Sequence, residues 1–447
     1  MRPSRVLLPA VALALAVGAA SAACAGSAAS RPANWPGYHG GGEHRGVSTT
    51  MPPAGPLKVV KKVHLDGAVY GSPIVVNGTV VVATENDTVY GLTTAGTVRW
   101  RRHLAAPSPA SQRACGDIDP LGITGSPVYS SRTGDVYVVA ETGGGGVRHI
   151  LVALSLKSGA LRWRRSVDFP GRDPAAMQQR GALALAGTRV WVTFGGLLGD
   201  CANYGGRLIG VPRTGRGGVV RYSVPTAREA GMWQAAGPAV ASRGRIFVSV
   251  GNGAAGAGDR YDHSDSVLLL NDSARLQQFF APSTWAQDNA GDVDLGSVGP
   301  ALVGTKWVVQ GGKSNRVFVL RQGRLGGIGG QVSTAQICAS YGGAAVAGNI
   351  VYLPCTDGVR ALRVDAGGHL HVEWRFSPGA SGSPVVGGGR VWILDPGAGI
   401  LYAAATGTGA VKEQVSVGST SRFATPALYG RLVLVPTMAG LTIVSGG

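Results

Sequence analysis

Residues 71–100 read Gly-Ser-Pro-Ile-Val-Val-Asn-Gly-Thr-Val-Val-Val-Ala-Thr-Glu-Asn-Asp-Thr-Val-Tyr-Gly-Leu-Thr-Thr-Ala-Gly-Thr-Val-Arg-Trp. The Asn-Gly pair at 77–78 lies between two β-branched runs, which is a strong signal for a tight hairpin. An Ala-Gly turn at 95–96 separates two further short runs. The stretch therefore predicts four antiparallel strands, at 74–76, 80–83, 89–92 and 98–100.

The opening of this stretch recurs along the chain. Each instance has a small-small-Pro triplet or a variant of it, an apolar strand, a Gly turn and a second apolar strand. A spacing of about 40 to 60 residues fits one four-stranded propeller blade per repeat. The eight instances begin at residues 71, 125, 180, 236, 298, 343, 382 and 424, and the third reads Arg180-Gly181-Ala182. The sequence thus predicts an all-β chain folded as an eight-bladed β-propeller.

The last repeat has too little chain after Pro426 to form four strands. Residues 58–65, ahead of the first repeat, are expected to supply the missing outer strand and close the ring, which leaves no free sheet edge. Residues 57–447 then form one propeller domain, expected to be a monomer.

The first residues have the pattern of a secretory signal peptide. A basic start precedes an apolar run at 6–20 and a small-residue step at Ala20-Ser21-Ala22, so residues 1–22 are predicted to be removed. Residues 23–56 then form an exported N-terminal segment, in which Cys24 is a candidate for a lipid anchor. The protein is expected outside the cytoplasm, either extracellular or associated with the cell envelope.

The composition is basic, with 41 Lys and Arg against 24 Asp and Glu and a net charge of +17. A basic stripe for nucleic acid would need clustered Arg with interleaved aromatic residues, whereas Arg is expected to be scattered through turns and strand ends here, which argues against nucleic-acid binding. Two interpretations stay open: a compositional bias, or attraction to an anionic wall polymer or ligand.

Strand direction selects one face of the predicted ring. Loops that follow the second strands and segments that precede the first strands meet there, so their side chains should converge. The former include Glu85, Glu141, Asp200, Cys201, Asn252, Lys313 and Cys355; the latter include Cys115, Trp233, Asp292, Asp294 and Cys338.

Asn34-Trp35-Pro36-Gly37-Tyr38-His39, with Arg45-Gly46-Val47-Ser48 after it, resembles the segment that opens many pyrroloquinoline-quinone (PQQ) repeat propellers. A narrower resemblance is to quinoprotein alcohol and polyvinyl-alcohol dehydrogenases, in which PQQ and calcium lie on the propeller axis over a tryptophan. That resemblance implies an alcohol or polyol dehydrogenase with PQQ and calcium as cofactors.

Four positions carry the narrower resemblance. Trp233 resembles the tryptophan beneath the quinone, Asn252 the calcium-ligating asparagine, and Asp294 the catalytic base. Lys313 resembles the basic residue that contacts the quinone. Asp200, Asn252 and Asp294 would offer the hard oxygen ligands that calcium prefers.

This chain also departs from that pattern. The adjacent cysteine pair of those enzymes is reduced to Cys115, and their calcium-ligating glutamate is missing. Cys115 and Cys201 share a rim of neighbouring blades, and a hairpin near Gly348 brings Cys338 opposite Cys355, so two disulfides are expected.

Two classes of function follow. The first is a PQQ- and calcium-dependent dehydrogenase that acts on a small-molecule or polymer substrate. The second is a non-catalytic envelope propeller that binds a protein partner or serves as an assembly scaffold, because one fold hosts many functions.

Overall fold

Short strands joined by turns make up almost all of the computed structural model, which describes residues 1, 3–4, 31–376 and 378–447. Most of the predicted signal peptide and Cys24 lie outside these described residues. Residues 32–447 form one compact unit. Within the part of the chain that the structure describes, no helix is both long and apolar enough to cross a membrane.

The first blade has the four predicted strands. β3 (Ile74–Val76), β4 (Thr79–Ala83), β5 (Thr88–Thr93) and β6 (Val98–His103) pair in antiparallel order, and the Asn77-Gly78 turn joins β3 to β4. Both turn residues have positive φ, 51° and 73°, as a tight two-residue hairpin requires.

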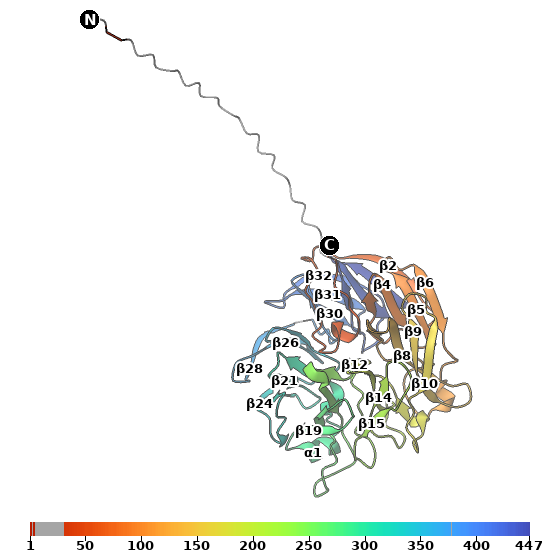
Figure 1. The fold of residues 1–447 in the computed structure, drawn as a ribbon. Helices are drawn as coiled ribbons and strands as arrows, with labels where there is room; N and C mark the ends of the chain where they lie inside the picture. The colour runs from red at the N-terminus through yellow and green to blue at the C-terminus, as the bar shows by residue number, and fades with distance from the viewer. Residues whose placement is uncertain (2, 5–30, 377) are drawn as a thin grey trace. The chain divides into compact units, whose positions relative to one another are not determined.

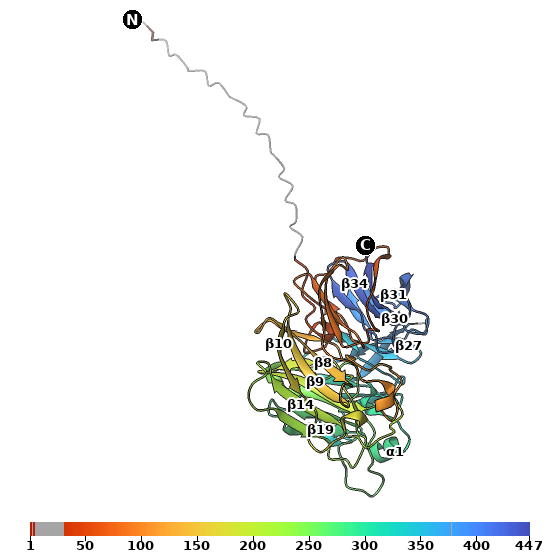
Figure 2. The ribbon, with the colours of Figure 1, turned by 90° about the vertical axis from the view of Figure 1, so that its right-hand side faces the viewer.

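Seven further sheets repeat this arrangement and confirm the eight-bladed propeller (Figure 1). The second is β7 (Val128–Ser130), β8 (Asp135–Thr142), β9 (Arg148–Ser155) and β10 (Leu161–Ser166). The third is β12 (Ala184–Ala186), β13 (Arg189–Gly196), β14 (Arg207–Pro212) and β15 (Val220–Ser223); the fourth is β16 (Ala239–Val240), β17 (Ile246–Val250), β18 (Ser266–Leu270) and β19 (Leu276–Ala281). Figure 2 shows β9, β14 and β19 of three successive blades following one another.

The fifth blade is β20 (Ala301–Val303), β21 (Trp307–Gln310), β22 (Arg316–Arg321) and β24 (Ser333–Gln336); the sixth is β25 (Ala345–Ala347), β26 (Ile350–Cys355), β27 (Gly358–Val364) and β28 (Leu370–Arg375). The seventh is β29 (Val385–Gly387), β30 (Arg390–Asp395), β31 (Ile400–Ala405) and β32 (Val411–Ser416). A short α-helix, α1 (Trp285–Ala290), precedes the fifth blade.

The ring closes as the sequence predicts. β2 (Lys58–His64) pairs antiparallel with β35 (Gly440–Ser445) and completes a last blade with β33 (Ala427–Tyr429) and β34 (Leu432–Thr437). Val63 is the buried residue of β2 and joins the apolar cluster between the last and first blades. The last blade is therefore complete only with an N-terminal strand.

Residues 34–48 lie across the innermost strands of several blades. Trp35 bridges to Val75, and Val47–Ser48 (β1) pairs in parallel with β29. Further backbone hydrogen bonds join Tyr129 to Pro36, Val240 to Gly42 and Val346 to Arg45. This segment, whose sequence resembles the opening of PQQ-repeat propellers, thus ties five blades together through their inner strands.

Tryptophans of the outermost strands form hydrogen bonds to the neighbouring blades. Trp100 donates its indole N–H to the Leu156 carbonyl at 3.0 Å, and Trp163 donates to Arg213 at 3.2 Å. A Cβ on Gly159 would lie 2.4 Å from the Trp100 ring, so position 159 of this turn accepts only glycine. These tryptophans therefore pack between neighbouring blades.

Both predicted disulfides are present. Cys115 bonds Cys201 with their Cα atoms 6.1 Å apart, and Cys338 bonds Cys355 at 5.7 Å. The first bridge ties the loop before the second blade to the loop after β13, and the second joins the end of β26 to the segment that precedes β25.

Replacing both Cys115 and Cys201 with serine is expected to lower the free energy of unfolding by about 2–4 kcal/mol, because the bridge closes a long loop. Denaturant unfolding of the oxidised protein and the variant measures this difference. Reduction of the wild type should move its midpoint in the same direction, and an unchanged midpoint in both experiments would contradict the assignment.

Candidate functional site

A cavity of about 440 Å³ opens on the face selected by strand direction. It is formed by segments that precede first strands and loops that follow second strands, as predicted. Trp233, Asp294, Lys313 and Asp200 line it, together with Arg180, Leu197, Tyr341, Arg422 and Phe423. The structure therefore brings together four of the five predicted cofactor and metal residues.

The Trp233 indole is packed against the backbone of adjacent loops. A Cβ on Gly251 would lie 2.4 Å from the Trp233 ring, and one on Gly231 would lie 2.1 Å from it. Tyr204 flanks the indole, with ring centroids 6.1 Å apart. These close contacts fix the plane of a half-buried indole on the cavity wall.

Asp294 and Lys313 form an ion pair beside this indole. The Lys313 Nζ atom lies 2.6 Å from Asp294 Oδ2 and 2.8 Å from Asp292 Oδ1. The other Asp294 oxygen accepts the backbone N–H of Asn252 at 2.7 Å. A Cβ on Gly251 would lie only 2.3 Å from this oxygen, so the loop after β17 holds the carboxylate closely.

Burial and charge act in opposite directions on this pair. Burial raises the pKa of Asp294 to about 6, although Lys313 and the Asn252 N–H oppose the rise. Burial also disfavours the Lys313 ammonium, but Asp294 and Asp292 outweigh it and hold its pKa above the ordinary value. Asp294 can therefore accept a proton near neutral pH, as a general base must.

The remaining predicted ligands are less well placed. Asn252 lies behind Asp294 rather than on the cavity wall, and its buried Oδ1 atom has no hydrogen-bond partner among the residues that the structure describes. Asp200 accepts the hydroxyl of Tyr204. Among the described residues, no group of three or more His, Cys, Asp and Glu side chains could hold a metal ion.

Sequence reasoning missed two arginines of the site. The Arg180 and Arg422 guanidinium carbons lie 4.9 and 4.8 Å from the centroid of the Phe423 ring. Burial, with Arg422 nearby, lowers the pKa of Arg180 to about 10. The sequence did contain an indication of this site, because Arg180 is a charged residue at the first position of a repeat, where most repeats have a small residue.

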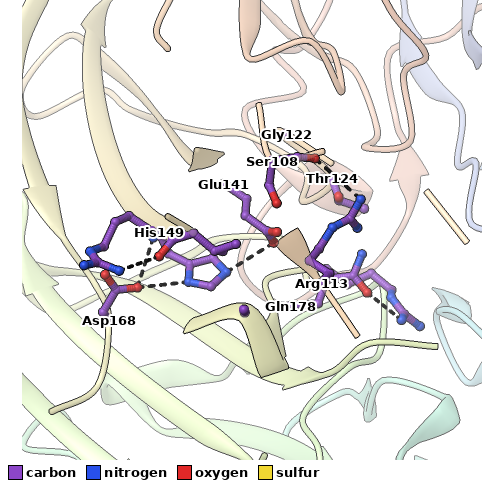
Figure 3. A network of polar contacts seen from close by, with 12 residues as sticks. Ser108, Arg113, Gly122, Thr124, Glu141, His149, Asp168 and Gln178 are labelled. Atoms are coloured by element: carbon purple, nitrogen blue, oxygen red, sulfur yellow. Dashed lines mark hydrogen bonds and ion pairs between the residues drawn. The ribbon is translucent and has the colours of Figure 1, made fainter. Parts of the chain in front are cut away.

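Two carboxylates expected on the same rim are buried away from the cavity. Figure 3 shows the His149 imidazole between Glu141 and Asp168, with nitrogen–oxygen distances of 3.3 and 3.0 Å. Glu85 is also buried, and its Oε2 accepts the Gly122 N–H at 2.8 Å. Neither glutamate lines the cavity, because each turns toward partners within and between the blades.

This network should make the protein less stable at alkaline pH. Burial opposes the imidazolium of His149, but Asp168 and Glu141 outweigh it and raise its pKa to about 9. A raised histidine pKa stabilises the fold fully below pH 6.5, and this contribution is lost as the pH rises through about 9. Burial raises the pKa of Glu85 to about 8, so its ionisation acts in the same direction between about pH 4.5 and 8.

Thermal unfolding from pH 6 to 10 tests this expectation, with His149→Gln as the variant. Leaving buried carboxylates without their cation should cost about 3–5 kcal/mol at pH 6, and the loss should shrink toward pH 10. A loss independent of pH would show that His149 is neutral in the fold.

Known proteins similar to this chain include both dehydrogenases and an assembly factor. Residues 58–190 match a protein-family model described as outer membrane protein assembly factor BamB. The quinohemoprotein alcohol dehydrogenase of Comamonas testosteroni superposes with a TM-score of 0.70 at 16% identity, over 94% of this chain and 82% of that one. The resemblance to PQQ-repeat propellers is confirmed.

Two further solved structures support the PQQ-like fold. Quinohemoprotein alcohol dehydrogenase ADHIIG of Pseudomonas putida gives a TM-score of 0.71 at 14% identity, over 93% of this chain and 81% of that one. BamB of Moraxella catarrhalis gives 0.60 at 16% identity, over 87% and 99%. No curated protein matches the sequence. At these identities the likeness concerns the propeller fold.

Proposed function

We propose that the PQQ-like propeller binds PQQ in the cavity beside Trp233 and uses it to oxidise an alcohol or polyol. The observation that carries this proposal is the combination of a fixed indole, three cationic side chains and one carboxylate with a raised pKa around a single cavity. Perturbed carboxylates in apolar clefts are frequent at catalytic sites.

The residues present suit a flat, anionic cofactor. A tricyclic ring can stack on the Trp233 indole, and its carboxylates would be attracted by Arg180, Arg422 and Lys313. The cavity of about 440 Å³ is within the usual range for a ligand of this size.

Calcium fits less well. Within the described part of the chain the Asn252 Oδ1 atom has no hydrogen-bond partner, but Lys313 already pairs with Asp294 and Tyr204 donates to Asp200. Six to eight oxygen ligands are usual for Ca²⁺. Calcium therefore remains a prediction from the resemblance.

Bound PQQ would supply the two-electron oxidant. The Asp294 carboxylate would take the proton of the substrate hydroxyl, and the Asn252 N–H would hold that carboxylate in place. The Lys313 ammonium would keep Asp294 ionised and attract an oxygen of the cofactor. Proton removal by Asp294 is thus general base catalysis.

A binding propeller without catalysis is the second candidate. The family match to BamB covers residues 58–190, and the described residues lack a metal cluster. In that case the same face would receive a protein partner. The two disulfides favour an oxidising compartment and thus support export in either case. The ends of the signal peptide at residue 22 and of the N-terminal segment at residue 56 stay predictions.

A titration of the purified protein with PQQ, in which binding is monitored by tryptophan fluorescence, tests the proposal. Lys313→Ala should weaken binding about 10- to 100-fold, because a charge-assisted contact is lost. Lys412→Ala, on β32 and outside the cavity lining, is the matched control and should bind normally. Absence of PQQ binding by the wild type, with and without Ca²⁺, would favour the scaffold.

A further inference from the structure

The outermost strands of three adjacent blades form a basic surface. Lys58, Lys61 and Lys62 lie on β2, Arg99, Arg101 and Arg102 on β6, and Arg162, Arg164 and Arg165 on β10. We call these nine residues the cationic band. No Asp or Glu occurs on the three strands, and every member except the half-buried Arg165 is exposed.

The other outermost strands differ. β15, β19, β24, β28 and β32 together carry Arg221, Arg375 and Lys412 against Glu373 and Glu413, a net charge of +1. Charged edge strands prevent edge-to-edge aggregation, but that requirement applies to every blade. It does not explain why the cations gather on three neighbours, so the expectation of scattered arginines needs correction.

The three strands form a continuous surface. The turn at Gly96, between β5 and β6, packs against Val63 and Lys61 of β2. Trp100 and Arg102 of β6 bond to the carbonyls of Leu156 and Gly159, in the turn before β10. Figure 1 shows β2, β6 and β10 along one side of the ring.

Most of these charges are not neutralised within the protein. In the described part of the chain, Arg162 is the member of the band that forms an ion pair, with Asp135 at 3.5 Å. Arg99, Arg102 and Arg165 donate to neutral oxygens of the protein. The band therefore presents a largely uncompensated positive field.

Each of these strands also exposes one large apolar side chain. Val60, Val98 and Leu161 are 48%, 47% and 48% exposed. The tryptophans of β6 and β10, in contrast, pack against the neighbouring blade and are not available for stacking on bases. A soluble polyanion or nucleic acid would need the cations but not the exposed aliphatic residues.

We propose that the cationic band docks the propeller on an anionic phospholipid surface. The lysines and arginines would contact headgroup phosphates, while Val60, Val98 and Leu161 would enter the interface between headgroups and acyl chains. Each Lys or Arg near such a surface increases partitioning about fivefold. Several cations together therefore give substantial attachment, and salt should weaken it.

Vesicle sedimentation of residues 23–447, the chain without its predicted signal peptide, tests this docking. The wild type should bind phosphatidylcholine vesicles that contain phosphatidylglycerol and should not bind pure phosphatidylcholine. The triple variant Lys62→Glu, Arg101→Glu, Arg164→Glu changes one exposed residue on each strand, chosen because its side chain makes no hydrogen bond or ion pair among the described residues. It should bind on the order of a hundredfold more weakly.

The matched control is Arg275→Glu, Arg375→Glu, Lys412→Glu, which changes the net charge equally on exposed residues outside the band. It should bind anionic vesicles more than tenfold better than the band variant. Equal binding by the two variants would show that only net charge matters and would overturn the proposal, as would failure of the wild type to bind. Circular dichroism and thermal unfolding verify the fold of each variant.

A second variant distinguishes a membrane from a soluble polyanion as the partner of the cationic band. Val98→Ser with Leu161→Ser keeps every charge, and it should weaken vesicle binding while leaving retention on immobilised polyphosphate unchanged. If these substitutions leave vesicle binding unchanged and free polyphosphate abolishes it, the band is a polyanion site and the membrane proposal is wrong.

Discussion

Replacement of residues 58–64 by a Gly-Ser segment of equal length should abolish the soluble, cooperatively folded protein. The change removes β2 and leaves β35 with an unpaired edge in an otherwise closed ring. It also removes Val63 from the cluster between the last and first blades. An exposed strand edge is a template for aggregation. Size-exclusion chromatography and thermal unfolding should show aggregates and no sharp transition.

Two controls accompany this experiment. Lys61→Ser with Lys62→Ser changes exposed side chains and keeps the strand backbone, so the fold should survive. A synthetic peptide of residues 57–65, added during refolding, should restore part of the soluble fraction. A soluble and cooperative Gly-Ser variant would mean that β2 is dispensable for closure.

Asp294→Asn is expected to reduce PQQ-dependent turnover about 10²- to 10⁴-fold, because an amide cannot accept the substrate proton. Binding of PQQ should change little, since the amide keeps the shape of the side chain. In the wild type, kcat/KM should rise with pH through about 6 as Asp294 ionises. A dye-linked alcohol oxidation assay measures both effects.

Asp292→Asn is the matched control. Asp292 contacts the same Lys313 ammonium, but its side chain is 70% exposed whereas that of Asp294 is 3% exposed. We expect Asp292→Asn to keep most of the activity. Loss of activity in Asp292→Asn together with normal activity in Asp294→Asn would show that Asp294 is not the general base.

The ring could be predicted because its determinants are local and repeated. The Asn77-Gly78 hairpin, the recurrent small-residue triplets and the short last repeat together require eight blades and an N-terminal strand. Both disulfides could be predicted, Cys115–Cys201 from the shared rim of neighbouring blades and Cys338–Cys355 from the hairpin near Gly348. Strand direction selected the cavity face, which is why Trp233, Asp294 and Lys313 meet there.

The remaining site features depend on side-chain orientation. Strand counting places Glu85 and Glu141 on the cavity rim, yet their side chains are buried in polar contacts among the blades. Glu141 and His149 are direct partners across β8 and β9, so the hairpin register could have revealed that pair. Asp168 lies just after β10, and its contact with His149 depends on the course of the chain beyond that strand. The position of the Arg180 guanidinium over Phe423 depends on a contact between distant segments.

A crystal structure of the protein with PQQ would test the central claim most directly. We predict density for a planar tricyclic ligand stacked on Trp233, with its anionic groups near Arg180, Arg422 and Lys313 and with Asp294 facing the open side of the cavity. Density for PQQ elsewhere on the ring, or a cavity that stays free of PQQ at saturating concentration, would contradict the proposed function.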